Sequence, residues 1–193
     1  MERIAMPDLN ALPSTLVQNW PIWLLSIVLV VAAVIDGWKL KVPNWITLPL
    51  VLSGWVYSTA YFGWEGLGWS LLGTMVGLAL LLPAYAIGGM GAGDVKLLAG
   101  VGAWVWATTT LYAFCVSAII GGVIAVAMVV VRRDWQYHSI KFWTIVAEIL
   151  EIRDPNVLSA IAAERKSTML LLPYGIPIAI GSITYFLCTG MLL

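Results

Sequence analysis

The sequence is poor in charged side chains. Lys, Arg, Asp and Glu make up only 10% of its 193 residues, and hydrophobic residues make up 61%. A soluble globular domain carries roughly 25% charged residues. A chain this apolar could not cover its surface with polar groups in water. The composition therefore excludes an ordinary soluble domain and predicts a protein whose solvent is the lipid bilayer.

The chain also lacks net charge and clusters of metal-binding side chains. Its ten basic and ten acidic residues balance, so no basic field would attract nucleic acid. There is one histidine, His138, and there are two cysteines, Cys115 and Cys188, which lie far apart in apolar runs. Without a CxxC pair or a Cys/His cluster, the sequence predicts neither a zinc site nor a cofactor. We expect the two cysteines to be buried apolar thiols.

Long apolar runs dominate the rest of the sequence. A transmembrane helix needs about 20 mostly apolar residues, and a break is expected near the tryptophans and threonines of residues 104–110. The first run follows a mixed N-terminal segment, so we interpret it as a retained span and not as a signal peptide. The sequence predicts an all-α, polytopic membrane protein with about six transmembrane helices, over residues 20–35, 45–62, 67–87, 94–107, 111–131 and 174–192.

The basic residues predict the orientation of these helices. With six spans, Arg3 lies on one side of the membrane, and the other nine basic residues lie on the opposite side, in or beside the connections 36–44, 88–94 and 132–169. Positive residues concentrate on the cytoplasmic side of membrane proteins. We therefore expect both termini to face outward and these three connections to face the cytoplasm.

The connection 132–169 is the largest polar segment of a chain that we interpret as a single domain, residues 1–193. Apolar residues recur at near-helical spacing within residues 139–152, which predicts an amphipathic helix on the inner membrane surface. Asp154 and Pro155 then have the pattern of a helix start. The segment could dock a substrate, or it could be a solvated connector.

Two acidic residues stand out because they lie at the expected ends of spans. Asp36 closes the first span and Asp94 opens the fourth, and six spans place both at the cytoplasmic end. Each could be only a capping or interfacial aspartate. Together they could form a dyad in which one carboxyl holds a proton while the other acts as a base. Such a pair can activate water on a peptide carbonyl without a metal or a covalent intermediate.

A glycine-rich segment precedes Asp94. Four glycines lie within residues 88–93, and they allow close backbone approach. The segment could be a bare turn. It does not match a phosphate-binding loop, because it lacks the Lys-Ser/Thr ending of that motif.

These motifs resemble the type IV prepilin peptidases, a family of membrane aspartic proteases. Gly91-Ala92-Gly93-Asp94 is the GxGD signature, continued by Val95-Lys96. The segment from Asp36 to Val42-Pro43-Asn44 resembles the first-aspartate motif of the family, and residues 173–181 resemble its last span.

The resemblance implies an enzyme of the bacterial inner membrane that removes leader peptides from prepilin or pseudopilin substrates at the cytoplasmic face. It implies Asp36 and Asp94 as the catalytic pair, with Gly91, Gly93, Lys96, Pro43 and Asn44 as supporting motif residues. Residues 36–45 are too few to hold the inserted methyltransferase domain of larger members. This resembles the short form found in tight-adherence (Flp) pilus systems, so we expect neither methylation nor zinc.

Other interpretations stay open. The chain could be a non-enzymatic scaffold of the same fold, a small proton-coupled carrier, or a GxGD protease of the preflagellin or signal-peptide type. Gly73 and Gly77 form a small-xxx-small pair that could serve a homo-oligomer or internal packing.

Overall fold

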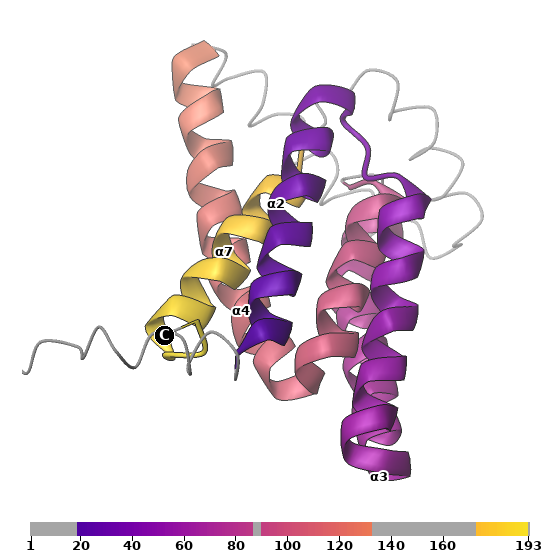
Figure 1. Cartoon of the computed structure of the whole chain (residues 1–193). Helices are drawn as coiled ribbons and strands as arrows, with labels where there is room; N and C mark the ends of the chain where they lie inside the picture. The colour runs from indigo at the N-terminus through magenta and orange to yellow at the C-terminus, as the bar shows by residue number, and fades with distance from the viewer. Residues whose placement is uncertain (1–18, 87–89, 133–172, 193) are drawn as a thin grey trace, which may run out of the picture.

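The computed structural model describes residues 19–86, 90–132 and 173–192, and all the regular structure in these ranges is helical. The helices are α2 (Trp20–Lys39), α3 (Asn44–Ala86), α4 (Ala92–Arg132) and α7 (Gly175–Cys188) (Figure 1). Three of them, α2, α3 and α4, are long and apolar enough to cross a membrane, and α7 is a shorter apolar helix. The predicted all-α membrane fold is confirmed. The connection 132–169 lies almost wholly outside the described residues.

Two of the helices are broken near their middle. Gly63 in α3 (φ 66°) and Trp106 in α4 (φ 64°) leave helical geometry, so each long helix is two helical segments joined at a kink. The kink at Gly63 falls between the second and third expected spans, and the kink at Trp106 falls at the end of the fourth, within the break expected at residues 104–110. Phe62 and Trp106, one from each kink region, contact each other with ring centroids 5.3 Å apart. The number of membrane crossings stays a prediction.

Helices α3 and α4 pack closely because small residues face each other. A Cβ on Gly73 would collide with the carbonyl oxygen of Gly102, and one on Gly77 would collide with the backbone of Leu98 and Ala99. The Ser70 hydroxyl donates to the Ala103 carbonyl across this contact. The Gly73–Gly77 pair is therefore used within the chain, against α4.

Helix α7 connects the first helix with the rest of the bundle. It packs against α4, where a Cβ on Gly181 would collide with Ser117. Helix α2 also packs mainly against α7 and makes few contacts with α3 or α4. The contact of α2 with α7 therefore fixes the position of the side chains on α2.

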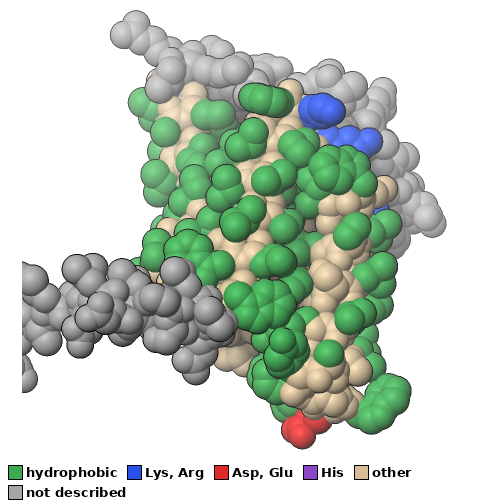
Figure 2. Space-filling model, in the orientation of Figure 1, with side chains coloured by type: hydrophobic (Ala, Val, Ile, Leu, Met, Phe, Trp, Pro, Cys, Tyr) green, Lys and Arg blue, Asp and Glu red, His purple; other side chains and the backbone are tan. Residues whose placement is uncertain are grey.

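The outer surface of the bundle is apolar, as a lipid environment requires. Figure 2 shows hydrophobic side chains over its visible face, with basic side chains at one end and an acidic one at the other. Cys115 and Cys188 are free and exposed on this surface. The expectation that they are buried among other side chains was wrong, because an apolar residue in a lipid-facing helix does not need to face the core.

Candidate active site

Asp36 lies one turn before the end of α2, which continues to Lys39 beyond the expected span end. Its side chain is only 2% exposed. The backbone N–H of Gly175 donates to Asp36 Oδ2 at 2.8 Å, although the two residues are 139 positions apart. Gly175 is the first residue of α7. The carboxylate of Asp36 thus sits at a helix N-terminus, where free N–H groups and the helix dipole stabilise negative charge.

Gly175 has to be a glycine for this contact. A Cβ at this position would lie 2.8 Å from Asp36 Oδ2 and 3.1 Å from Asp36 Cγ. Real Cβ atoms do not approach other atoms as closely as the first of these distances, so a side chain would displace the carboxylate, the backbone of α7, or both. The small residue allows the helix start to approach the acid directly.

Asp94 is the third residue of α4 and is 5% exposed. The backbone N–H of Gly91 donates to Asp94 Oδ2 at 3.2 Å, while the N–H of Asp94 donates to the Gly91 carbonyl at the same distance. This is half of a capping box, in which an acidic side chain reaches back to the residue before the helix. Asp94 therefore takes part in capping from inside the helix and not as the N-cap residue, and this contact holds its carboxylate in place.

Tyr174 and Gly175 bring the two aspartates into one region. Gly175 binds Asp36, and the half-buried phenol of the preceding Tyr174 lies close enough to Asp94 to interact with its charge. Two carboxylates from helices that hardly contact each other therefore lie near the start of α7, one bonded to Gly175 and the other within electrostatic range of Tyr174. Neither Tyr174 nor Gly175 was among the site residues predicted from the sequence. The only signal was the resemblance of residues 173–181 to a family's last span.

Gly93 of the GxGD motif allows a second close approach, between the start of α4 and the connection from α2 to α3. A Cβ on Gly93 would collide with the backbone carbonyl of Val42, in the short connection between α2 and α3. Val42 is 2% exposed. Gly93 therefore lets the start of α4 pack directly onto the segment that follows Asp36.

A hydrogen bond between Lys96 and Asn44 also connects the segment after Asp94 with the segment after Asp36. Lys96 Nζ donates to Asn44 Oδ1 at 2.9 Å, across 52 positions of sequence. Asn44 is the first residue of α3, and the carbonyl of Pro43 accepts the N–H of Ile46 at 3.1 Å in the first turn. The contact of Lys96 with Asn44 gives this lysine a structural role that the sequence did not specify.

All these contacts lie at one end of the bundle. The end of α2 and the starts of α3, α4 and α7 meet there, whereas the kinks of α3 and α4 lie at the opposite end (Figure 1). The basic side chains visible in Figure 2 are at the aspartate end. The structure thus brings Asp36, Asp94, Gly91, Gly93, Lys96, Pro43 and Asn44 to one region.

Comparisons with known proteins place this chain in a family. Residues 23–126 match the type IV leader peptidase family, and these residues are more than half of the chain. The chain therefore belongs to the type IV leader peptidase family. The matched range contains both aspartates but ends before α7, so Tyr174 and Gly175 come from outside it. No solved structure matches the chain.

Similar curated proteins carry a double name. A "Prepilin leader peptidase/N-methyltransferase" of Aeromonas hydrophila is 31% identical over 147 residues, which is 71% of this chain and 50% of that protein. The protein of the same name from Aeromonas salmonicida (strain A449) is 31% identical over 131 residues, which is 64% of this chain and 45% of that protein. The chain thus spans about half the length of the curated relatives it matches.

Proposed function

We propose that this protein is a membrane aspartic endopeptidase that removes the leader peptide from prepilin-like substrates, with Asp36 and Asp94 as its catalytic pair. One observation carries the proposal. Two buried carboxylates from different helices lie at the same end of the bundle, where Asp36 accepts a hydrogen bond from Gly175 and Asp94 lies within electrostatic range of the adjoining Tyr174. The family membership and the names of the Aeromonas relatives supply the substrate class.

The geometry supports acid–base hydrolysis. Two carboxyl groups in a site of low dielectric constant do not both ionise readily, so one keeps a proton. The ionised carboxylate takes a proton from a water molecule while the oxygen of that water attacks the scissile carbonyl carbon. The protonated carboxyl then gives its proton to the departing amide nitrogen as the C–N bond breaks. The N–H groups of Gly175 and Gly91 hold the two side chains in place during both steps.

The distribution of charge supports an orientation in the bacterial inner membrane. Lys39, Lys41 and Lys96 belong to the helix ends that surround the aspartates, while exposed Glu65 lies beside the kink at Gly63. Positive residues favour the cytoplasmic side. The active site then faces the cytoplasm, the termini face outward, and residues 1–193 act as one membrane-embedded peptidase domain.

A co-expression assay tests the activity. A prepilin-like protein from the same genome is expressed with wild-type protein, Asp36→Asn, Asp94→Asn or Glu65→Gln, and its N-terminus is identified by mass spectrometry. Wild type and Glu65→Gln should remove the leader, while either Asp→Asn variant should leave it intact. Leader retention with wild type, repeated for every prepilin-like protein of the genome, would favour a non-enzymatic scaffold.

A further inference from the structure

The kink of α4 is formed by a tryptophan in a backbone conformation that glycine normally takes. Trp106 has φ 64° and ψ 179°, and Gly63, at the kink of α3, has nearly the same φ of 66° with ψ −154°. A residue with a Cβ is strained in this region of φ and ψ. Such strain persists only where the surrounding structure holds the residue, and it is concentrated at functional sites. The turn alone would be easier for glycine, so the tryptophan points to a further role.

Three contacts hold Trp106 in this conformation. Its ring packs edge-on against the ring of Phe62, beside the other kink, with centroids 5.3 Å apart. Its Cα lies so close to Gly73 of α3 that a Cβ on that glycine would approach it to 2.8 Å. Its carbonyl accepts the Thr110 hydroxyl at 2.6 Å. Because ring, Cα and carbonyl are each held, the angle between the two arms of α4, residues 92–105 and 107–132, is held as well.

The first arm of α4, residues 92–105, packs with α3 and carries Asp94. Gly102 of this arm lies against Gly73 of α3, and the Trp104 indole N–H donates to the Leu50 carbonyl of α3 at 2.9 Å. Figure 1 shows this arm beside α3 and the other arm beside α7. Asp94 lies in the first turn of the first arm. Its position is therefore fixed relative to α3.

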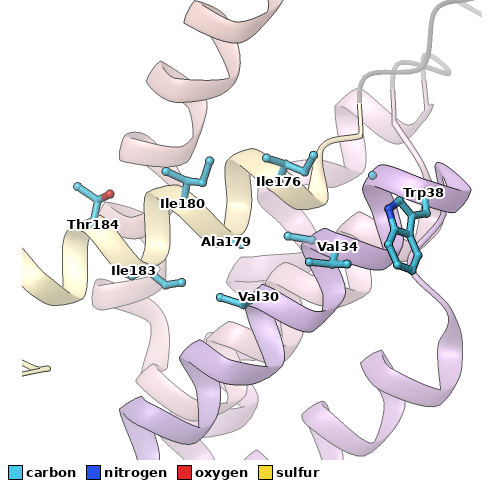
Figure 3. Close-up of a pocket in the computed structure, with 10 residues that line it drawn as sticks. Val30, Val34, Trp38, Ile176, Ala179, Ile180, Ile183 and Thr184 are labelled. Carbon is cyan, nitrogen blue, oxygen red and sulfur yellow. The ribbon is translucent and has the colours of Figure 1, made fainter.

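The second arm, residues 107–132, packs with α7 and, through α7, places Asp36. A Cβ on Gly181 of α7 would collide with Ser117 of this arm. Helix α7 holds the Asp36 carboxylate through the Gly175 N–H and makes most of the contacts of α2. Figure 3 shows α2 and α7 side by side, with apolar side chains of both lining one groove between them: Val30 and Val34 from α2, and Ile176 and Ile183 from α7. The two aspartates therefore belong to different arms of α4.

Aromatic rings hold the helices together at the kink end of the bundle. Trp20, at the start of α2, packs edge-on against Tyr57 of α3 at 5.5 Å and against Trp104 of the first arm at 6.3 Å. Tyr57 and Trp104 stack with centroids 5.1 Å apart. Since these contacts restrain the kink end, a change of the angle at Trp106 would move the helices most at the opposite end, where the two aspartates lie.

We propose that Trp106 is a positioning residue for the catalytic pair, because it fixes the angle between the arm that carries Asp94 and the arm that places Asp36. The proposal rests on the proposed function and specifies what keeps the two carboxylates at a working separation. Asp94 lies about 18 Å from Trp106 along the first arm, at about 1.5 Å per residue, so a change of about 5° at the kink moves it by roughly 1.5 Å relative to Asp36. A displacement of about 1 Å can cost on the order of 100-fold in rate.

Cleavage kinetics and thermal unfolding separate positioning from simple stability. Trp106→Gly should lower kcat by about tenfold or more with KM unchanged. Its apparent Tm should stay close to that of wild type, because the lost ring contact and the relieved strain oppose each other. Trp106→Phe keeps a Cβ and a ring against Phe62 and should retain most of kcat. Trp64→Ala is the control, since Trp64 lies beside the other kink and is 84% exposed, and it should behave as wild type.

Pulsed EPR measures the angle between the arms without requiring cleavage. Both native cysteines are replaced by serine, and spin-labelled cysteines are introduced at Leu82, near the end of α3, and at Val126, in the second arm, which are 54% and 57% exposed. Val126 lies about 30 Å from Trp106, so a rotation of about 5° moves it by roughly 2.5 Å. The distance distribution in proteoliposomes should shift or broaden by about that amount or more in Trp106→Gly and should match wild type in Trp106→Phe and Trp64→Ala.

An unchanged distance distribution in Trp106→Gly would overturn the proposal, and so would a wild-type kcat in that variant or a kcat loss fully explained by a lower Tm. If Trp106→Gly does not fold, Phe62→Ala removes the partner ring instead, and wild-type distance and kcat in that variant would overturn the proposal. If wild type cleaved no prepilin-like substrate, the proposed function would fail, and the distance measurement would still decide whether Trp106 fixes the angle between the arms.

Discussion

The backbone N–H of Gly175 donates to Asp36 Oδ2 at 2.8 Å, and at that distance a glycine is the one residue that fits. This contact ties the first and last described helices together at the acid. It also means that the position of Asp36, the side chain proposed to be catalytic, depends on a residue outside the range that matches the family. The consequences can be measured.

Gly175→Ala should lower kcat without changing KM for the leader substrate. The added Cβ would lie 2.8 Å from Asp36 Oδ2 and would displace the carboxylate. A misplacement of about 1 Å can cost on the order of 100-fold in rate. Steady-state kinetics in detergent measure the effect. Gly122→Ala is the control, because a Cβ there meets no atom within 4 Å. A variant with normal kcat would show that Gly175 does not position Asp36.

Tyr174→Phe should lower kcat by about 10-fold to 100-fold. The change removes the hydroxyl that lies near the charge of Asp94 but keeps the ring. The ring packs closely against Gly121, where an added Cβ would lie 3.0 Å from it. A polar interaction with a charged group contributes roughly 1.5–3 kcal/mol at most. The apparent Tm should stay close to that of wild type. An unchanged kcat would remove Tyr174 from the active site.

Gly93→Ala should destabilise the protein by about 1–3 kcal/mol, the range for overpacking a tight contact. Its Cβ would collide with the backbone of Val42, which cannot move without shifting the segment after Asp36. Thermal unfolding in detergent measures the loss, and cleavage should decrease with it. Gly68→Ala is the matched control, since nothing lies within 4 Å of its added Cβ. Equal stability of the two variants would contradict the close approach of α4 to the α2–α3 connection.

Lys96 and Asn44 should be coupled. Lys96→Met and Asn44→Leu each remove one partner of the 2.9 Å contact, and each should lower stability by about 1 kcal/mol or less, as expected for an exposed hydrogen bond. The double variant should lose little more than the larger single loss. A double-mutant cycle on the thermal unfolding data measures the coupling. Additive losses would mean that the contact contributes nothing.

The cleaved product should carry an unmethylated N-terminus. The connection between Lys39, the last residue of α2, and Asn44, the first of α3, leaves no room for an inserted domain at that place. Mass spectrometry of the processed substrate reads the methylation state directly. A methylated product formed by this protein alone would contradict the short-form interpretation.

Much of this arrangement could be predicted from the sequence because it depends on local pattern. Apolar runs predicted the helices, and the breaks expected near residues 62–67 and 104–110 are the kinks at Gly63 and Trp106. The shared depth of Asp36 and Asp94 predicted that they lie at one end of the bundle. The resemblance to the family indicated which glycines, which lysine and which asparagine belong to the same motifs.

Contacts between distant residues could not be predicted in the same way. Gly175 and Asp36 are 139 positions apart, and no local pattern shows that one donates to the other. Lys96 could have faced lipid headgroups, and its contact with Asn44 depends on how α3 and α4 pack. Gly73 and Gly77 fitted a dimer as well as an internal contact until the position of Gly102 was known. The cysteines were misjudged because hydrophobicity does not distinguish a core from a lipid-facing surface.

The most direct test of the central claim compares single and double substitutions of the two aspartates. Leader cleavage is measured in proteoliposomes with wild type, Asp36→Asn, Asp94→Asn and the double variant. Residues that act as one catalytic unit have non-additive effects. Each single variant should therefore lower the rate by about 1000-fold or more, and the double variant should be no slower than the slower single one. A single variant that cleaves at the wild-type rate, or losses that multiply in the double variant, would contradict a catalytic pair formed by Asp36 and Asp94.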